Sequence, residues 1–254
     1  MSAAPLGLFR GEAAIVTGAA GRIGQAIARH LAAEGATVHL VDRDGPGADA
    51  LAGRIADQGG RAVAAAVDLS DRAALDAFCT AHLARQGAPD MVVHAACPTL
   101  PSGGPDWATG DAEWDQMIEV GVGAARRMVR HFVPAMRRAG RRGRFLLLTS
   151  LHAETPRTHA HYSATKAAMT MLTKELAREL GPSGIRVNAL APGYVPDDRG
   201  PPAPRIPLGR AGTGDDVAGM AAVLLSDRFS AYVTGTTVVV DGGLSLVNWI
   251  PRRP

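Results

Sequence analysis

Residues 13–35 read AAIVTGAAGRIGQAIARHLAAEG, and this stretch is the strongest indication of the fold class. It begins with a short apolar run, AAIVT, which is typical of a buried strand. Apolar residues spaced three or four apart then predict a helix over 22–34. Gly18, Gly21 and Gly24 lie between these two elements. The stretch therefore predicts a strand, a tight turn and a helix.

The same alternation of short and long elements continues along the chain. We expect further strands over 37–41, 61–67, 91–96, 144–150, 185–191 and 236–243. We expect further helices over 47–58, 71–85, 111–139, 159–180 and 214–226. Alternation of this kind builds right-handed units whose strands lie parallel in one sheet. The predicted fold is α/β, a Rossmann-type doubly wound parallel sheet with helices on both faces, and residues 1–254 are expected to form a single domain.

The composition is that of a soluble globular protein. Of 254 residues, 46% are hydrophobic and 20% are charged, and the net charge is only +3. Because so small a charge creates no strong field, we expect no nucleic-acid partner and no membrane partner. The basic run RRAGRRGR at 137–144 is expected to be a solvated connector. No apolar run approaches the length of a membrane span.

The cysteines and histidines suggest no metal or disulfide chemistry. Cys79 and Cys97 form neither a metal-type pair nor a disulfide framework, which favours a cytoplasmic location. We expect no secretory signal at the N-terminus. His152, His159 and His161 are close in sequence, but their spacing matches no common zinc pattern. We therefore expect no metal.

The glycine turn suggests a dinucleotide site. Glycine lets the backbone approach a phosphate, and the N-terminus of the following helix offers free N–H groups. A tight turn without a ligand is the alternative. Asp42, at the end of the second strand, can accept hydrogen bonds from ribose hydroxyls and would repel a 2′-phosphate, unless it is only a turn residue. NAD is therefore expected as the cofactor rather than NADP, although Arg22 and Arg43 lie close enough to contact a phosphate.

The segment HYSATKAAM at 161–169 contains a lysine in a chain that otherwise relies on arginine. Only two of the 27 lysine and arginine residues are lysine. Tyr162 and Lys166 are four residues apart, which places them on one face of a helix. An ammonium beside a phenol stabilises the phenolate, so it is expected to lower the phenol pKa from about 10. The pair indicates a proton-transfer site, and a surface Tyr–Lys pair is the alternative.

A set of motifs in this order resembles the compact branch of the short-chain dehydrogenase/reductase family. The motifs are TGAAGRIG, DL at 68–69, LLLTS, YSATK, IRVNALAPGYV and YVTGTTVVVDGG, and they span essentially the whole chain. The resemblance implies that Tyr162 is the base and acid of the reaction and that Ser150 orients the reacting oxygen. It implies that Lys166 holds the nicotinamide ribose and lowers the pKa of the tyrosine.

The turn, the strand ends and the resemblance together predict a cofactor site. Its residues are Gly18, Gly21, Arg22, Ile23, Gly24, Asp42, Arg43, Asp68, Leu69, Ala95, Ala96, Tyr162, Lys166, Pro192, Gly193 and Val195. Asp68 and Leu69 are expected beside the adenine, and Asp68 has the alternative role of capping the next helix. His152 and Tyr194 are candidate substrate contacts, and Trp107 is a candidate pocket wall. Cys97 is expected to be a small buried residue, and a contact to the substrate is the alternative.

The chain departs from the compact pattern at several positions. The TGxxGxxG spacing and the segment HAAC at 94–97 resemble the extended branch, but the chain has no room for the substrate domain of that branch. The family's active-site asparagine, which holds a water in the proton relay, falls on Gly121. The relay is then expected to pass through His94, His152 or a backbone-bound water. Loop 194–207 is short and rich in proline, with Asp197 in place of a common threonine, and we expect no large mobile lid there.

We therefore expect an NAD-dependent oxidoreductase that acts on CH–OH donors and interconverts a secondary alcohol and a ketone. The short loop, together with His152, Glu154 and His161 near the site, favours a small polar substrate such as a sugar, polyol or hydroxy acid. The alternatives are a biosynthetic ketoreductase, a cyclic-diol dehydrogenase, or an NAD-binding regulatory protein that has lost catalysis. The resemblance implies a homodimer or homotetramer in which the helices at 111–139 and 159–180 pair. The substrate, the stereochemistry and the physiological direction stay open.

Overall fold

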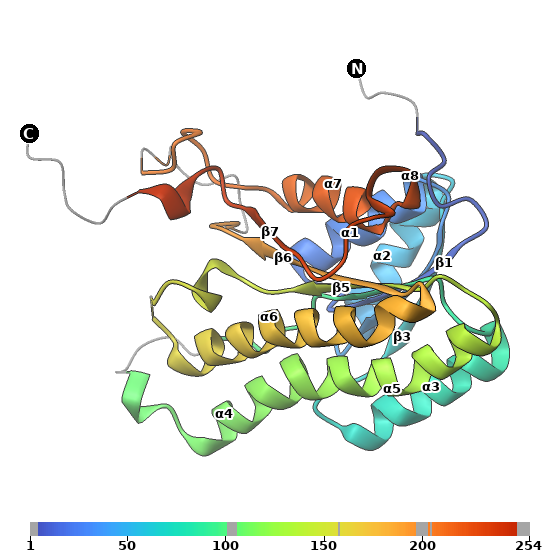
Figure 1. Ribbon diagram of the computed structural model, residues 1–254, viewed down its shortest axis with the longest axis horizontal. Helices are drawn as coiled ribbons and strands as arrows, with labels where there is room; N and C mark the ends of the chain where they lie inside the picture. The colour runs from blue at the N-terminus through green and yellow to red at the C-terminus, as the bar shows by residue number, and fades with distance from the viewer. Residues whose placement is uncertain (1–4, 101–105, 157, 197–202, 204, 248–254) are drawn as a thin grey trace, which may run out of the picture.

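The computed structural model describes residues 5–100, 106–156, 158–196, 203 and 205–247. Its seven strands form one parallel sheet in the order β3-β2-β1-β4-β5-β6-β7, with helices on both faces (Figure 1). The order reverses between β1 and β4, and this reversal leaves a crevice at the carboxyl ends of the strands. The predicted fold class is confirmed.

All seven predicted strands are present. They are β1 (Ala13–Thr17), β2 (Thr37–Asp42), β3 (Arg61–Ala66), β4 (Met91–His94), β5 (Arg144–Leu148), β6 (Arg186–Pro192) and β7 (Thr237–Val240). Three strands end at least two residues earlier than predicted: β4 and β5 by two residues each, and β7 by three. The residues that directly follow β4 and β5 line the crevice: Ala95, Ala96, Thr149 and Ser150.

The predicted helices are also present. They are α1 (Arg22–Ala33), α2 (Gly45–Asp57), α3 (Arg72–Gln86), α4 (Asp111–Ile118), α5 (Ala124–Arg138), α6 (Ala160–Leu180), α7 (Gly214–Leu225) and the short, unpredicted α8 (Asp227–Ser230). The single helix predicted over 111–139 is wrong in one respect. A π-helical turn, η2 (Glu119–Gly123), separates α4 from α5. It went unpredicted because the apolar residues on either side keep a helical spacing.

Two apolar cores lie on opposite faces of the sheet. On one face, side chains of α1 and α2 pack against β1 and β2 and those of α7 against β5 and β6, and Ile27, Leu51 and Val217 are fully buried there. On the other face, side chains of α3, α5 and α6 pack against β1, β4 and β6 (Figure 1). Ile15 belongs to the second core and its neighbour Val16 to the first, as the two-residue period of a strand requires.

Two buried histidines make the stability of this fold depend on pH. The rings of His39 on β2 and His82 on α3 lie edge to face with centroids 4.5 Å apart, and both side chains are buried. Burial first, and the charge of His39 second, lower the pKa of His82 to about 4; burial lowers the pKa of His39 as well. The unfolded chain, whose histidines have a pKa of about 6.5, then binds more protons in the mildly acidic range. Stability is therefore lost as the pH falls below about 6.5.

We predict that His82→Phe flattens this dependence. Between pH about 7.5 and about 5, His82 should account for a loss of about 2 kcal/mol in the free energy of unfolding. Urea denaturation of both proteins at the two pH values measures the difference. An identical pH dependence in wild type and variant would show that His82 is not held neutral in the folded protein.

Candidate active site

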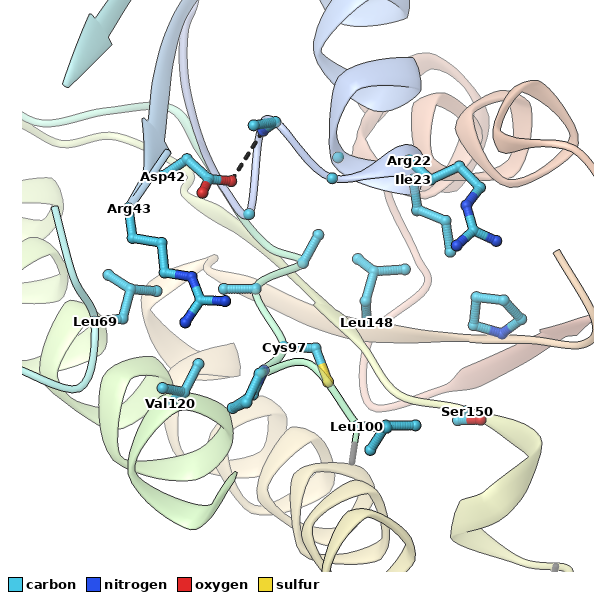
Figure 2. Close-up of a pocket in the computed structure, with 18 of the residues that line it drawn as sticks. Arg22, Ile23, Asp42, Arg43, Leu69, Cys97, Leu100, Val120, Leu148 and Ser150 are labelled. Atoms are coloured by element: carbon cyan, nitrogen blue, oxygen red, sulfur yellow. Dashed lines mark hydrogen bonds between the residues drawn. The ribbon is translucent and has the colours of Figure 1, made fainter. Parts of the chain in front are cut away.

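A cavity of about 680 Å³ opens at the carboxyl ends of the strands, beside the reversal between β1 and β4. Figure 2 shows the glycine turn and Asp42 on one wall and Ser150 on the opposite wall. Every predicted catalytic and cofactor residue lines this one cavity. They are Gly18, Gly21, Arg22, Ile23, Gly24, Asp42, Arg43, Asp68, Leu69, Ala95, Ala96, Ser150, Tyr162, Lys166, Pro192, Gly193 and Val195.

The glycine turn brings the backbone close to neighbouring main chain. Gly18 has a φ of +67°, and a Cβ there would lie 2.6 Å from the backbone of Ala96. A Cβ on Gly24 would lie 2.0 Å from the carbonyl oxygen of Gly18. Only glycine fits these two positions. No side chain caps α1, so the N–H groups of its first turn face the cavity without a protein cap.

Acidic and basic side chains meet at the end of β2. Asp42 accepts hydrogen bonds from the backbone N–H of Ala20 at 2.9 Å and of Asp44 at 3.0 Å. The carboxylate therefore shapes the turn, and it also lines the cavity. Arg43 extends across the cavity wall toward Thr99, to whose hydroxyl it donates at 3.3 Å (Figure 2). Because a carboxylate disfavours a 2′-phosphate and a guanidinium favours it, this end does not by itself discriminate NAD from NADP.

Arg22 lies on the other side of the glycine turn. Its guanidinium donates a hydrogen bond to the carbonyl oxygen of Val195. This bond ties the turn to the segment that follows β6, which lines the same cavity through Pro192 and Gly193. Residues 197–202 and 204, including Asp197 and most prolines of the predicted stiff loop, lie outside the described residues.

Asp68 occupies a turn rather than a helix cap. Its carboxylate accepts hydrogen bonds from the N–H of Ser70 at 2.8 Å and from the hydroxyl of Ser70 at 2.7 Å. These bonds lower the pKa of Asp68. The cap of α3 is Asp71, which accepts from two N–H groups of the first turn. The alternative of Asp68 as a helix cap is therefore wrong, while Leu69 is buried against the cavity.

Ser150, Tyr162 and Lys166 converge at the far wall. Ser150 follows β5, whereas Tyr162 and Lys166 lie one turn apart on α6. The ammonium of Lys166 donates to the carbonyl oxygen of Leu148 at 2.7 Å, and its side chain is only 4% exposed. Its Nζ atom lies 5.4 Å from the centroid of the Tyr162 ring. The three side chains can therefore act on one ligand.

The pKa of Tyr162 differs from the expectation. In the protein alone, burial raises the pKa of Tyr162 to about 12, although a hydrogen bond with Ser150 opposes the rise. Burial also lowers the pKa of Lys166. The ammonium lies over the ring, 5.4 Å from its centroid, and it does not offset the loss of hydration. The geometry of the predicted pair is present, but a lowered tyrosine pKa is not.

The candidate substrate residues have different surroundings. Tyr194 lines the cavity, as predicted, and is 53% exposed. His152 does not line the cavity; its ring packs edge to face on Tyr162 with centroids 5.1 Å apart. Trp107 is 88% exposed and is not a cavity wall, which corrects the prediction. Cys97 was expected to be buried, yet it is exposed within the cavity (Figure 2).

Some cavity residues were not identified from the sequence. Leu100, Gln116 and Val120 reach the cavity from segments without a recognisable motif. Leu148 and Thr149 also line the cavity, and the sequence could have identified them, because they directly precede Ser150 in a predicted strand. Within the described ranges, no group of three or more His, Cys, Asp or Glu side chains could hold a metal ion. No helix in the same ranges is long and apolar enough to cross a membrane.

Comparison with known proteins gives matches over nearly the full chain. A family profile described as enoyl-(acyl carrier protein) reductase matches residues 18–245. The 3beta-hydroxysteroid dehydrogenase 1 of Eggerthella lenta is 37% identical, covering 94% of this chain and 95% of its own. The cyclohexanol dehydrogenase of Rhodococcus sp. strain TK6 is 33% identical, covering 93% and 97%.

A solved structure is similar over the same length. It is a putative NAD(P)-dependent gluconate 5-dehydrogenase from Beutenbergia cavernae with bound NADP at low occupancy. It superposes with a TM-score of 0.84 at 34% identity, covering 93% of this chain and 98% of its own. The likeness therefore covers the sheet and its helices.

Proposed function

This chain belongs to the short-chain dehydrogenase/reductase family, and from that premise we propose that it interconverts a secondary alcohol and a ketone with NAD. The observation that carries the proposal is the convergence of Ser150, Tyr162 and Lys166 in the cavity that also contains the glycine turn. Nothing else in the cavity combines a titratable hydroxyl with a buried cation among the described residues.

The cavity fits a dinucleotide. Its volume of about 680 Å³ lies within the usual range for ligand sites, about 300–1,000 Å³. The two glycines whose Cβ atoms would collide with backbone make one wall, at the N-terminus of α1. Asp42 and Arg43 would face the adenosine ribose, and Lys166 would donate to the nicotinamide ribose with the N–H groups left after its bond to Leu148. The bound nicotinamide would supply the acceptor or donor of hydride.

The protein residues handle the proton. In alcohol oxidation, the substrate carbon loses a hydride and the substrate hydroxyl loses a proton, so that a carbon–oxygen double bond forms. Tyr162, as phenolate, would take that proton, and Ser150 would hold the same oxygen through its hydroxyl. Lys166 would stabilise the phenolate, together with the positive ring of the oxidised cofactor. In ketone reduction, Tyr162 would return the proton.

For the substrate, we propose a small polar secondary alcohol such as a sugar, polyol or hydroxy acid. Support comes from polar side chains that line the same cavity as Tyr162, which include Gln116 and Tyr194. The similar gluconate dehydrogenase structure agrees with this class. A second candidate is a cyclic alcohol, favoured by the relative named cyclohexanol dehydrogenase and by the apolar side chains of Leu100 and Val120.

Two measurements test the proposed function. Calorimetric titration with NAD and with NADP should show binding of a single dinucleotide per chain. A panel of polyols, hydroxy acids and cyclic alcohols, followed by nicotinamide absorbance, should then show turnover. Dinucleotide binding without turnover on the whole panel would instead favour a regulatory protein that has lost catalysis, an alternative motivated by Gly121 and His94.

We predict that Asp42→Asn changes the cofactor preference. The variant keeps one acceptor oxygen for the turn but removes the charge that disfavours a 2′-phosphate, while Arg43 remains. The ratio of kcat/KM for NAD to that for NADP should fall about 10- to 100-fold, the effect of one hydrogen bond to a charged group. Asp49→Asn, on the exposed face of α2, is the matched control. An unchanged ratio in Asp42→Asn would show that Asp42 serves the turn alone.

Assembly, location and domain extent are also part of the proposal. A homodimer or homotetramer is supported by exposed apolar side chains on the helices expected to pair, Ile118 on α4 and Met171 on α6. A cytoplasmic location is supported by two cysteines that are both free thiols. A single domain over 1–254 is supported by the continuous sheet.

A further inference from the structure

The π-helical turn η2 is held by a side chain from the sheet. In a π turn the hydrogen bonds shift to i→i+5, so carbonyl groups are displaced from the regular helical ladder. His94, the last residue of β4, lies with its Nε2 atom 3.0 Å from the carbonyl oxygens of both Val120 and Gly121. Its Nδ1 atom lies 2.8 Å from the hydroxyl of Thr17, at the end of β1. One imidazole therefore joins two strands to the turn.

These partners determine the protonation of His94. Carbonyl oxygens only accept hydrogen bonds, so Nε2 must carry the proton. Nδ1 must then accept, and the hydroxyl of Thr17 donates to it. The side chain is fully buried, and burial together with the positive charge of Lys166 lowers the pKa of His94 to about 4. His94 is therefore a neutral donor with both ring nitrogens engaged, which leaves neither for the proton relay considered from the sequence.

The π turn that His94 holds packs closely against α6, the helix that carries Tyr162 and Lys166. A Cβ at Gly121 would lie 2.5 Å from the methyl group of Thr165 and 3.4 Å from the sulfur of Met169. Thr165 directly precedes Lys166 on α6, and its hydroxyl donates to the carbonyl oxygen of His161 at 2.8 Å. An asparagine at 121, as in the pattern that the sequence resembles, would push this part of α6 away. The absence of a side chain at Gly121 therefore makes room for the methyl group of Thr165.

We propose that His94 is a positioning residue for Tyr162 and Lys166, and that it acts by donating through Nε2 to the π turn against which α6 packs. This inference rests on the proposed function. In the family pattern, position 121 carries an asparagine side chain. In this chain position 121 is a glycine, and the side chain of His94 on β4 bonds to the backbone there instead. The position of Gly121 against Thr165 transmits the constraint to Lys166.

The effect on chemistry follows from the tight placement of Lys166. Its ammonium is buried and bonds to Leu148 on β5 at 2.7 Å, so a shift of α6 relative to β5 moves the phenol of Tyr162 relative to this anchored ammonium. A displacement of about 1 Å in an active site can cost about 100-fold in rate. The other titratable groups that face Tyr162 in the described structure are Cys97, after β4, and His152, on the turn after β5.

Two substitutions separate the bonds that His94 makes. The amide nitrogen of glutamine can take the place of Nε2, so His94→Gln keeps a donor for Val120 and Gly121. Asparagine is shorter and reaches only the place of Nδ1, so His94→Asn keeps a partner for Thr17 but loses the donor to the turn. Thr17→Val is the matched control, because it removes the hydroxyl and leaves the donor in place.

The test combines amide hydrogen exchange with the pH profile of kcat. In His94→Asn, exchange in the peptides covering 119–123 and the first turns of α6 should be at least about tenfold faster. Its kcat should fall about 10- to 100-fold, and the pH of half-maximal kcat should rise, while Kd for the cofactor changes less than about threefold. His94→Gln should restore all three readouts, and Thr17→Val should keep the wild-type pH profile.

The outcomes are distinguishable from failure of the proposed function. Wild-type exchange and wild-type kcat in His94→Asn would overturn the positioning role, as would equal impairment of His94→Gln and His94→Asn. If the wild type itself turns over no alcohol, the proposed function fails, and the exchange data alone then decide whether His94 holds the turn and α6.

Discussion

Tyr162→Phe is expected to lower kcat by about 1,000-fold or more, because the substrate hydroxyl loses the group that takes its proton. The substitution removes one oxygen and leaves the ring, which packs on His152 with centroids 5.1 Å apart. Cofactor binding should therefore change less than about threefold, since the glycine turn and Lys166 remain. Steady-state kinetics on the best alcohol of the panel, together with calorimetric titration of the cofactor, measure both effects.

The chain offers its own control for this variant. Tyr232 is fully exposed and remote from the cavity, so Tyr232→Phe should leave kcat unchanged. A Tyr162→Phe enzyme that keeps both its full rate and its cofactor affinity would remove the proposed mechanism.

Lys166→Arg is expected to lower kcat by about 100-fold, even though it preserves the positive charge. The ammonium occupies a buried site between the carbonyl oxygen of Leu148, at 2.7 Å, and the sulfur of Met169, at 3.9 Å. A planar guanidinium is larger and donates in a fixed fork, so it cannot take the same position without moving α6. This requirement explains why a chain so rich in arginine has a lysine here.

Lys174→Arg, two turns further along α6 on its exposed face, is the matched control and should behave as wild type. Unlike Tyr162→Phe, Lys166→Arg should also weaken cofactor binding, because Lys166 is proposed to donate to the ribose. Calorimetry separates these effects. A Lys166→Arg enzyme with wild-type kcat and Kd would show that any cation suffices at this position.

The parallel sheet and the succession of strands and helices along the chain could be predicted because local patterns carry that information. Short apolar runs between helical spacings identify buried parallel strands, and the glycine turn after β1 identifies the crevice. YSATK could likewise be placed on a helix facing the cavity, since four residues make about one turn. Ser150 could be placed at the crevice as well, because it lies two residues after the end of β5 at Leu148.

Other features depend on contacts between distant segments. The π turn at 119–123 is stabilised by His94, which is 25 or more residues away in sequence, so no local pattern reveals it. The burial of Tyr162, which raises its pKa to about 12, also arises from tertiary packing. The sequence spacing indicated the neighbouring cation, Lys166, but it could not indicate that Tyr162 loses its hydration. Cys97 was misjudged for the same reason, because a strand end can face a cavity as easily as a core.

Ultraviolet titration of the Tyr162 phenol, taken as the difference between wild type and Tyr162→Phe, most directly tests whether this tyrosine can act as the base. Without cofactor, the phenol should ionise at a pKa of about 12, as its burial requires. With saturating oxidised cofactor, we predict that the pKa falls by several units, because the nicotinamide ring and Lys166 then both stabilise the phenolate. A pKa that stays at about 12 with the cofactor bound would contradict the assignment of Tyr162 as the group that takes the proton.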